Sequence, residues 1–247
     1  MISESRLCQE VELNYPQRAL QTFKKYSQLN EFREFYLTVF SRLQKRLNSV
    51  ERAQLTHELV DHFTNEAKSD PTAESMISCR KGCSACCHTQ VSVNQDEAEL
   101  LATRILEDGI RIDIDSLAKQ FTAGNDSVAW FAIPYKQRGC VFLDDKGACR
   151  IYSDRPSVCR SNYVISDARH CDTSNGEYKT IRILKTSKAD FVTMAAFNLS
   201  SKGGTLPLML VESLNKLGEQ KLSKSMKKNF KKNSFKRLKE LFNSSVM

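Results

Sequence analysis

The stretch Cys79-Arg-Lys-Gly-Cys83-Ser-Ala-Cys86-Cys87 places four cysteines within nine residues. Thiolates are the side chains that hold zinc, copper(I) and iron–sulfur clusters, and gaps of two or three residues let one loop present several of them to one centre. Further cysteines follow along the chain, so that the predicted metal ligands are Cys79, Cys83, Cys86, Cys87, Cys140, Cys149, Cys159 and Cys171.

A disulfide framework is the alternative explanation of so many cysteines. Disulfides persist in oxidising compartments and are densest in small secreted domains with little core. Met1 to Leu13 carry several charges and no apolar run of signal-peptide length, and no apolar run elsewhere is long enough to cross a membrane. We therefore expect a cytoplasmic protein with no transmembrane segment and with reduced, metal-binding cysteines. Cys8 is expected to be a lone thiol.

Helical periodicity dominates the N-terminal part of the sequence. Asn48 with Glu51 three residues later predicts the start of a helix that follows the one predicted over 31–47. The two helices are expected to pack as an antiparallel pair. Asp70-Pro71 interrupts the pattern before the cysteine loop. The first helix is predicted over 31–47, with a core-facing stripe of Phe32, Phe35, Tyr36, Val39, Phe40, Leu43 and Leu47.

The region after the cysteine loop mixes extended and helical signals. Val91 and Val93 predict a short strand, and Asn94 with Glu97 predicts a capping box for a helix that ends near Gly109. The segment 140–152, centred on an Asp-Asp-Lys-Gly turn, predicts a β-hairpin.

The register of this hairpin decides where its cysteines point. A loop with an even number of residues pairs Leu143 with Ala148 and puts Cys140 and Cys149 on one face, and we expect that register. A helical turn over 153–160 then carries Cys159 back towards the hairpin.

The remaining segments complete an α+β, predominantly helical fold. A strand is predicted over 178–184, a helix capped by Ser187 and Asp190 through Leu199, and a helix from Leu206 to Leu217 after the Gly203-Gly204 break. The predicted regions are 1–70, an N-terminal helical pair; 71–175, a cysteine-rich metal-binding module with a β-hairpin; 176–218, a strand and helices that complete the core; and 219–247, a basic amphipathic tail.

The tail holds most of the net charge of +8. Residues 219–247 carry nine basic and two acidic side chains, so the rest of the chain is nearly neutral. Leu222, Met226 and Phe230 recur at helical spacing, which predicts a basic amphipathic helix. Such a helix binds RNA or another nucleic acid, an acidic partner or an anionic membrane face, or it packs on its own domain. No sequence feature indicates an oligomeric state.

Eight thiols can be shared between metals in more than one way. They fill two four-thiolate sites, or one such site and a second with an open position. Adjacent Cys86 and Cys87 diverge in an extended chain, so one of them can serve another metal or remain a reactive thiol. His88 and His170 lie next to cysteines and are alternative ligands or surface residues. Arg150 and Arg160 each follow a cysteine and are predicted to bind a negatively charged cofactor or substrate.

The cysteine motifs resemble the YkgJ-like cysteine-cluster family, also called CxxCxxCC. The order and flanking residues of Cys79 to Cys87, Gly147-Ala-Cys149-Arg-Ile-Tyr152 and Arg155-Pro-Ser-Val-Cys159-Arg160 carry the resemblance. The first gap has three residues here and two in the family's name. The family is described as zinc- or iron-chelating and includes the flagellin lysine methylase. The resemblance implies a metal site, with iron–sulfur and zinc as the candidate occupants, and an iron–sulfur-dependent methyl transfer to a protein or RNA substrate.

Two other motifs are similar to enzyme signatures. The Cys79-x3-Cys83-x2-Cys86 spacing is shared with radical S-adenosylmethionine enzymes, which makes S-adenosylmethionine a candidate cofactor, although no βα repeat follows. His57 and His62 stand five residues apart, about 140° around a helix, so they do not form a zincin site and are expected to pack or face solvent. The alternative to an iron–sulfur transferase is a zinc-stapled binding module without catalysis.

Overall fold

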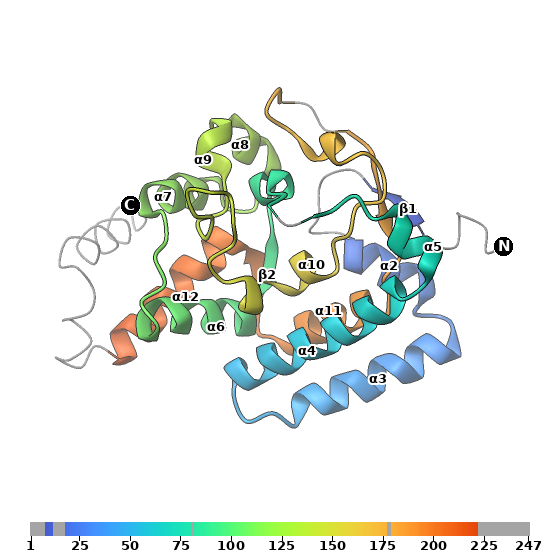
Figure 1. Cartoon of the computed structure of the whole chain (residues 1–247). Coiled ribbons are helices and arrows are strands. Elements are labelled where there is room, and N and C mark those ends of the chain that lie inside the picture. The colour runs from blue at the N-terminus through green and yellow to red at the C-terminus, as the bar shows by residue number, and fades with distance from the viewer. Residues whose placement is uncertain (1–7, 12–17, 81, 177–178, 222–247) are drawn as a thin grey trace.

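The computed structural model describes residues 8–11, 18–80, 82–176 and 179–221 (Figure 1). It is mostly helical, with two small antiparallel sheets that pair β1 with β3 and β2 with β4. This confirms the predicted α+β, predominantly helical fold class. In chain order the elements are β1 (Cys8–Val11), α2 (Arg18–Tyr26), α3 (Asn30–Gln44), α4 (Ser49–Lys68), α5 (Pro71–Met76), η2 (Ala85–His88), β2 (Ser92–Asn94), α6 (Gln95–Glu107), α7 (Ile114–Ala123), α8 (Ser127–Ala132), α9 (Tyr135–Arg138), η3 (Tyr152–Asp154), α10 (Ser157–Arg160), η4 (Ala168–Cys171), β3 (Ile181–Leu184), α11 (Ser187–Leu199), β4 (Gly203–Thr205) and α12 (Leu206–Lys221).

One buried cluster joins the N-terminal helices to a helix from the other end of the chain. α3 and α4 lie side by side, and α11 packs against both (Figure 1). The side chain of Asn48 accepts a hydrogen bond from the backbone N–H of Glu51, which confirms the predicted start of α4. The buried members of this cluster are Val39, Leu43, Leu55, Leu59, Val60, Ala189, Val192, Ala195 and Ala196.

The predicted core stripe extended too far along the chain. Leu47 is 90% exposed, so its assignment to the core is wrong. α3 ends at Gln44, and Leu47 lies in the connection to α4. An apolar residue at the expected spacing contributes to a stripe only while the backbone remains helical.

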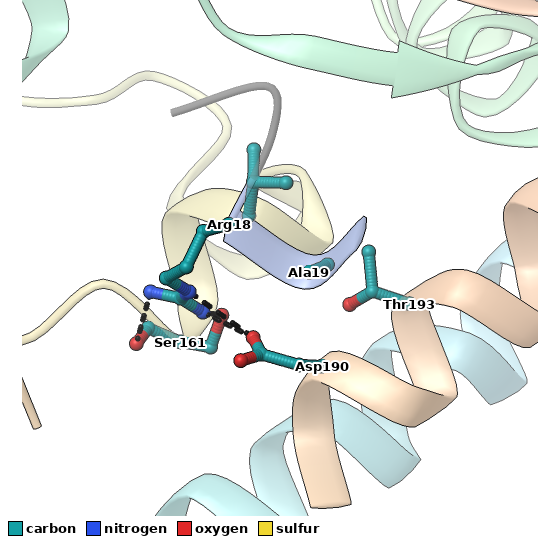
Figure 2. Close-up of a pocket in the computed structure, with 6 residues that line it drawn as sticks. Arg18, Ala19, Ser161, Asp190 and Thr193 are labelled. Atoms are coloured by element: carbon teal, nitrogen blue, oxygen red, sulfur yellow. Dashed lines mark hydrogen bonds and ion pairs between the residues drawn. The ribbon is translucent and has the colours of Figure 1, made fainter. Parts of the chain in front are cut away.

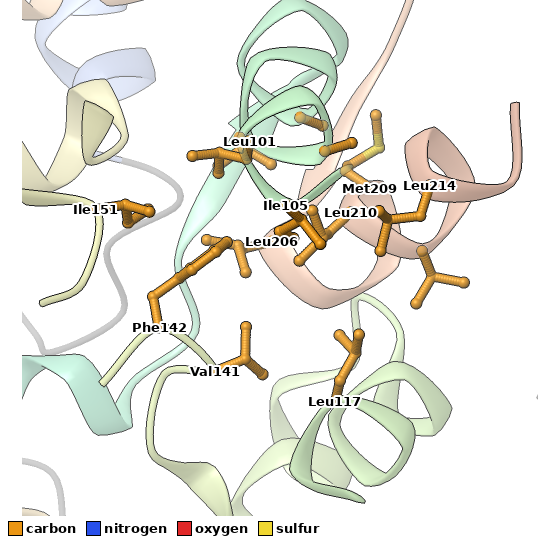
Figure 3. Close-up of a cluster of buried hydrophobic side chains, with 14 of the residues drawn as sticks. Leu101, Ile105, Leu117, Val141, Phe142, Ile151, Leu206, Met209, Leu210 and Leu214 are labelled. Carbon is orange, nitrogen blue, oxygen red and sulfur yellow. The ribbon is translucent and has the colours of Figure 1, made fainter. Parts of the chain in front are cut away.

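A second buried cluster packs against the segments that carry Cys140 and Cys149 (Figure 3). α6 packs on α12, and α7 also packs on α12. Asn94 and Glu97 form the predicted capping box, and Gly109 adopts a positive φ of 68° just after α6. The cluster contains Val93, Ala98, Leu101, Ala102, Ile105, Leu117, Val141, Phe142, Ile151, Leu206, Met209, Leu210, Val211, Leu214 and Leu217.

A buried ion pair attaches α2 to α11 and to the end of α10. Arg18 Nη2 lies 2.6 Å from Asp190 Oδ1, and the Thr22 hydroxyl donates to Asp190 Oδ2 at 2.8 Å. Arg18 also donates to the backbone carbonyl of Ser161 at 3.2 Å (Figure 2). Asp190 was predicted to cap α11 with Ser187. That prediction is wrong, because the cap is Thr186 without a side-chain bond and the Asp190 carboxylate binds Arg18.

The predicted hairpin is reduced to a turn with one antiparallel bridge. Leu143 pairs with Cys149, so the predicted pairing with Ala148 and the even-numbered loop are wrong. Asp144 Oδ1 accepts the backbone N–H groups of Lys146 and Ala148 at 2.9 and 2.8 Å, which stabilises the turn from inside. Because no ladder continues beyond the bridge, strand alternation does not decide where the neighbouring cysteines point.

The C-terminal helices begin where the sequence predicted. α11 spans Ser187–Leu199, and α12 starts at Leu206 and continues to Lys221. The predicted amphipathic helix from Leu222 onward lies outside the described residues. Within the described part of the chain, no helix combines the length and apolar character that crossing a membrane requires. The division into four regions stays a prediction.

Candidate metal centre

The eight predicted ligands lie on short segments with little regular structure. Cys79 and Cys83 precede η2, which carries Cys86 and Cys87. All eight are free thiols. Non-covalent contacts must therefore hold these segments together. The later cysteines lie beside the turn (Cys140 and Cys149), on α10 (Cys159) and at the end of η4 (Cys171).

Backbone hydrogen bonds connect the cysteine loop to the later segments. The N–H of Ser78 donates to the carbonyl of Val164 at 2.9 Å, and the N–H of Val164 donates to Cys79 Sγ at 3.2 Å. Further along the loop, the N–H of Cys140 donates to the carbonyl of Cys87 at 2.8 Å. The loop is thus fixed to one segment at each end.

The cysteines divide between two apolar surroundings. Cys79 and Cys86 pack against a cluster that contains Cys171, which is 3% exposed. Cys140 and Cys149 pack against the cluster between α6 and α12. These apolar residues bury Cys171 and leave six of the other cysteines partly exposed. The apolar neighbours of Cys79, Cys86 and Cys171 are Val164, Ile181 and Ile183. Those of Cys140 and Cys149 include Val141, Phe142 and Ile151.

The Cys86 thiol is a common neighbour of the thiols from later segments. Burial, followed by repulsion from Cys86, raises the pKa of Cys171 to about 12. Burial also raises the pKa of Cys140 to about 12, and repulsion from Cys149 and Cys86 adds to it. The pKa of Cys159 is raised well above its ordinary value by burial, then by Cys140 and Cys86. Thiolates here would repel one another, so a cation among them would stabilise the deprotonated forms.

Arg155 brings positive charge to the cysteine thiols. The sequence predicted this role for Arg150 and Arg160. The pKa values of four cysteines are raised, that of Cys86 first by its hydrogen bond with the Cys87 side chain and those of the other three first by burial, and Arg155 acts in the opposite direction on each. Its Nε is buried and has no hydrogen-bond partner among the described residues. Its position next to Pro156 marked it only as the start of a helical turn. The four thiols are those of Cys79, Cys86, Cys149 and Cys159.

Arg150 and Arg160 contact protein groups. Arg150 donates to the carbonyl of Leu143 and so supports the turn. Arg160 is buried and pairs with Asp61, and its Nε donates to the carbonyl of Arg155 at 2.8 Å. Cofactor binding by Arg150 and Arg160 stays a prediction, while their observed contacts hold the turn and α10 in place.

The two histidines beside cysteines differ in environment. His88 Nδ1 lies 3.1 Å from the carbonyl oxygen of Ser84, and its ring stacks on Tyr135 with centroids 4.2 Å apart. Burial lowers the pKa of His88, which favours the neutral ring that can accept or bind a metal. His170 is exposed on η4.

A buried carboxylate positions α10, which carries Cys159. Glu97 Oε1 accepts hydrogen bonds from the backbone N–H and the hydroxyl of Ser157, both at 2.7 Å, and lies 3.2 Å from His57 Nε2. Burial acts to raise the pKa of Glu97, but His57 and Ser157 outweigh it and hold this pKa below 4.5. The sequence marked Glu97 only as a capping-box residue. Its second role depends on a contact with a residue sixty positions away.

The donor set fits a soft metal, although the thiols do not form a closed shell. Among the residues that the structure describes, no three His, Cys, Asp or Glu side chains converge closely enough to hold a metal ion. Free thiols, apolar walls and the half-buried Arg155 guanidinium nevertheless suit zinc or an iron–sulfur cluster, whose thiolate ligands carry negative charge. Binding requires the thiols to move closer together, and the ligand role of each cysteine stays a prediction.

Residues 78–177 match the family model CxxCxxCC, described as "Putative zinc- or iron-chelating domain". The matched range includes all eight predicted ligands. It confirms the resemblance seen in the cysteine motifs and supports metal binding by this part of the chain. Neither the comparison with curated proteins nor that with solved structures gave a match.

Proposed function

We propose that residues 78–177 bind an iron–sulfur cluster of the [4Fe–4S] type through cysteine thiolates. The observation that carries this proposal is the gathering of thiols from separate segments around Cys86, with Arg155 as their counter-charge. The family match supports metal binding by the same residues. Reduced thiols fit a cytoplasmic location, which is part of the proposal.

The chain's own residues would hold the cluster and control its surroundings. Phe142 and Val164 are fully buried beside the cysteines and exclude water, which lowers the local dielectric. Arg155 offsets the negative charge of the thiolates, and its unpaired Nε is available as a hydrogen-bond donor to sulfur. When bound, a cluster of this type supplies electron transfer or an open iron position for a cosubstrate.

The reaction that we propose is modification of a protein or RNA by methyl transfer, with S-adenosylmethionine as the methyl donor. The family resemblance and the spacing of Cys79, Cys83 and Cys86 support this assignment. Cys83 is exposed, so the loop can be approached from solvent. A methyl-transfer assay with radiolabelled donor and the cell's RNA and protein fractions tests it. Absence of label in both fractions, with the cluster intact, contradicts methyl transfer.

Metal analysis of anaerobically purified protein tests the occupant. We expect iron and acid-labile sulfide, together with a brown colour. Colourless protein with stoichiometric zinc and no iron would contradict the cluster. Cys86→Ser and Cys159→Ser should each lower the metal content, and Cys8→Ser, outside the cysteine module, is the matched control. Unchanged metal in both module variants would mean that the ligands are grouped wrongly.

The second candidate is a zinc-stapled binding module without catalysis. It is favoured by the backbone hydrogen bonds that join the cysteine loop to later segments, from Ser78 to Val164 and from Cys140 to Cys87. A structural zinc at such a junction contributes folding free energy directly. The basic tail is then the proposed contact with nucleic acid or an acidic partner. RNA binding that weakens with salt and disappears when residues 222–247 are deleted would support that contact.

A further inference from the structure

We propose that His57, Asp61 and Glu97 are positioning residues of the metal centre, which hold α10, and with it the Cys159 thiol, in place for metal binding. The proposal rests on the proposed metal-binding function and adds the residues that set the affinity. His57 and Asp61 lie on α4, outside the range 78–177 that the family model matches.

α10 is too short to fix the direction of its own side chains. It spans only Ser157–Arg160, and a single helical turn has too few hydrogen bonds to be stable alone. The residue at its N-cap, Pro156, makes no side-chain cap bond. The orientation of α10 therefore depends on contacts with other elements, and α4 packs against it (Figure 1).

Glu97 of α6 holds the N-terminal end of α10. Its Oε1 accepts hydrogen bonds from the backbone N–H and the hydroxyl of Ser157, both at 2.7 Å. His57 Nε2 lies 3.2 Å from the same oxygen, and the side chains of His57 and Glu97 are 5% and 1% exposed. Hydrogen bonds to a buried carboxylate are strong, because water does not replace them when they break.

Arg160 connects the C-terminal end of α10 to α4. Its Nη1 pairs with the Asp61 carboxylate, and its Nη2 lies 3.3 Å from His57 Nδ1. Because a guanidinium only donates hydrogen bonds, His57 Nδ1 is the acceptor, and the ring proton on Nε2 is donated to Glu97. His57 and Asp61 are four residues apart and so lie on the same face of α4. The His57 ring thus joins the two ends of α10 through one chain of hydrogen bonds.

Cys159 lies between these two anchored ends. Its backbone N–H donates to the carbonyl of Pro156 at 2.9 Å, which completes the turn. Metal binding requires the thiols to move closer together, and a ligand that is already held loses less conformational entropy when it binds. Loss of an outer contact that orients a metal ligand lowers metal affinity by about 10- to 100-fold. The bonds to α4 and α6 therefore contribute to the affinity through Cys159.

Two measurements on the full-length protein test the role of His57. The first is the rate at which iodoacetamide labels each cysteine of the metal-free protein, followed by peptide mass spectrometry. The second is the Kd for Co²⁺ under anaerobic conditions, measured from the absorption of thiolate-bound Co²⁺. His57→Leu removes both hydrogen bonds of the ring. The labelling of Cys159 should therefore become faster relative to that of Cys171 on η4, and the Kd should rise about 10-fold.

A conservative variant and a matched control separate positioning from general packing. The amide of His57→Gln offers a donor and an acceptor, so it should restore most of the affinity and the slow labelling of Cys159. Asp96→Asn is the control, because Asp96 pairs with Arg52 at 2.7 Å and so joins α6 to α4 through a bond that does not involve α10. It should lower stability in urea and leave the labelling of Cys159 and the Kd unchanged.

Asp61→Asn carries the test if His57→Leu does not fold. The Asp61 side chain is 42% exposed, and Arg160 keeps its hydrogen bonds to the carbonyls of Ser153 and Arg155. This variant should raise the labelling rate of Cys159 and the Kd for Co²⁺ in the same direction by a smaller factor. Circular dichroism checks the helix content of each variant.

The outcomes distinguish the positioning role from metal binding itself. An unchanged Kd in His57→Leu and Asp61→Asn would overturn the positioning role and leave metal binding intact. An equal rise in the labelling of Cys159 and Cys171 would also overturn it, because general loosening of the fold explains that result. No thiolate-bound Co²⁺ in the wild type would overturn metal binding, and with it the effect on affinity.

Discussion

Replacing Asp190 by Asn should strongly destabilise the protein, because it leaves the Arg18 guanidinium buried without its carboxylate. The two side chains are 7% and 1% exposed. Arg18 donates to Asp190 through Nε and Nη2, and Thr22 donates to the second carboxylate oxygen. Removing one partner of a buried pair costs about 3–5 kcal/mol. The carbonyl of Ser161 remains as an acceptor for Arg18, so we expect the free energy of unfolding to fall by about 3 kcal/mol.

Urea denaturation at neutral pH measures this loss. With a slope of about 2 kcal/mol/M, a loss of about 3 kcal/mol lowers the midpoint by about 1.5 M. Glu66→Gln is the matched control, because its ion pair with Lys188 also involves α11 but has side chains 51% and 43% exposed. Such exposed pairs contribute about 0–1 kcal/mol. If Asp190→Asn shifts the midpoint no more than the control does, the ion pair is not desolvated as described.

Three further predictions concern the metal centre, acid stability and the core. Arg155→Gln should weaken metal affinity by about 10- to 100-fold, and Arg155→Lys should weaken it much less. Competition with a chromophoric chelator measures both affinities. Equal affinities of the two variants would argue against Arg155 as a counter-charge. The pKa of Glu97 in the folded protein lies below 4.5, so the ionised carboxylate stabilises the fold above pH 4.5 and this stabilisation is lost as the pH falls through the folded-state pKa. Glu97→Gln should therefore make the free energy of unfolding depend less steeply on pH in the acid range. Denaturation curves at several acid pH values measure this, and an unchanged slope would contradict it. Phe142→Ala should cost about 3–5 kcal/mol because Phe142 is fully buried; Leu47→Ala should stay within about 0.5 kcal/mol, and similar losses would refute the assigned burial.

Helix starts that depend on neighbouring residues were predictable. Asn48 and Asn94 cap their helices through bonds to backbone groups three residues away, so the sequence alone contains both partners. The same local logic would have found two helices that were not predicted, because Asp113 and Asp126 cap α7 and α8 in the same way. Propensity and capping act within one turn, and they carry over into the folded state when no long-range contact opposes them.

Features that depend on long-range contacts were not predictable. The register of the turn at Asp144 follows from side-chain bonds inside the turn and from the burial of Phe142, and it differs by one residue from the expected pairing. Asp190 was at capping distance from Ser187 in the sequence, but it binds Arg18 from a helix far along the chain. At Asp190 a partner from a distant helix is bound in place of the local one.

The sequence by itself determined the kind of centre, because soft-metal chemistry follows from thiol side chains at short spacings between Cys79 and Cys87. It also contained the cysteine motifs that carry the resemblance, and the family model CxxCxxCC matches residues 78–177. Only the tertiary structure decided which segments bring Cys140, Cys159 and Cys171 to that loop and that Arg155 is the charge beside them. The physical reason is that ligand type belongs to a single residue, whereas proximity and charge balance arise only when the buried clusters of distant segments have packed.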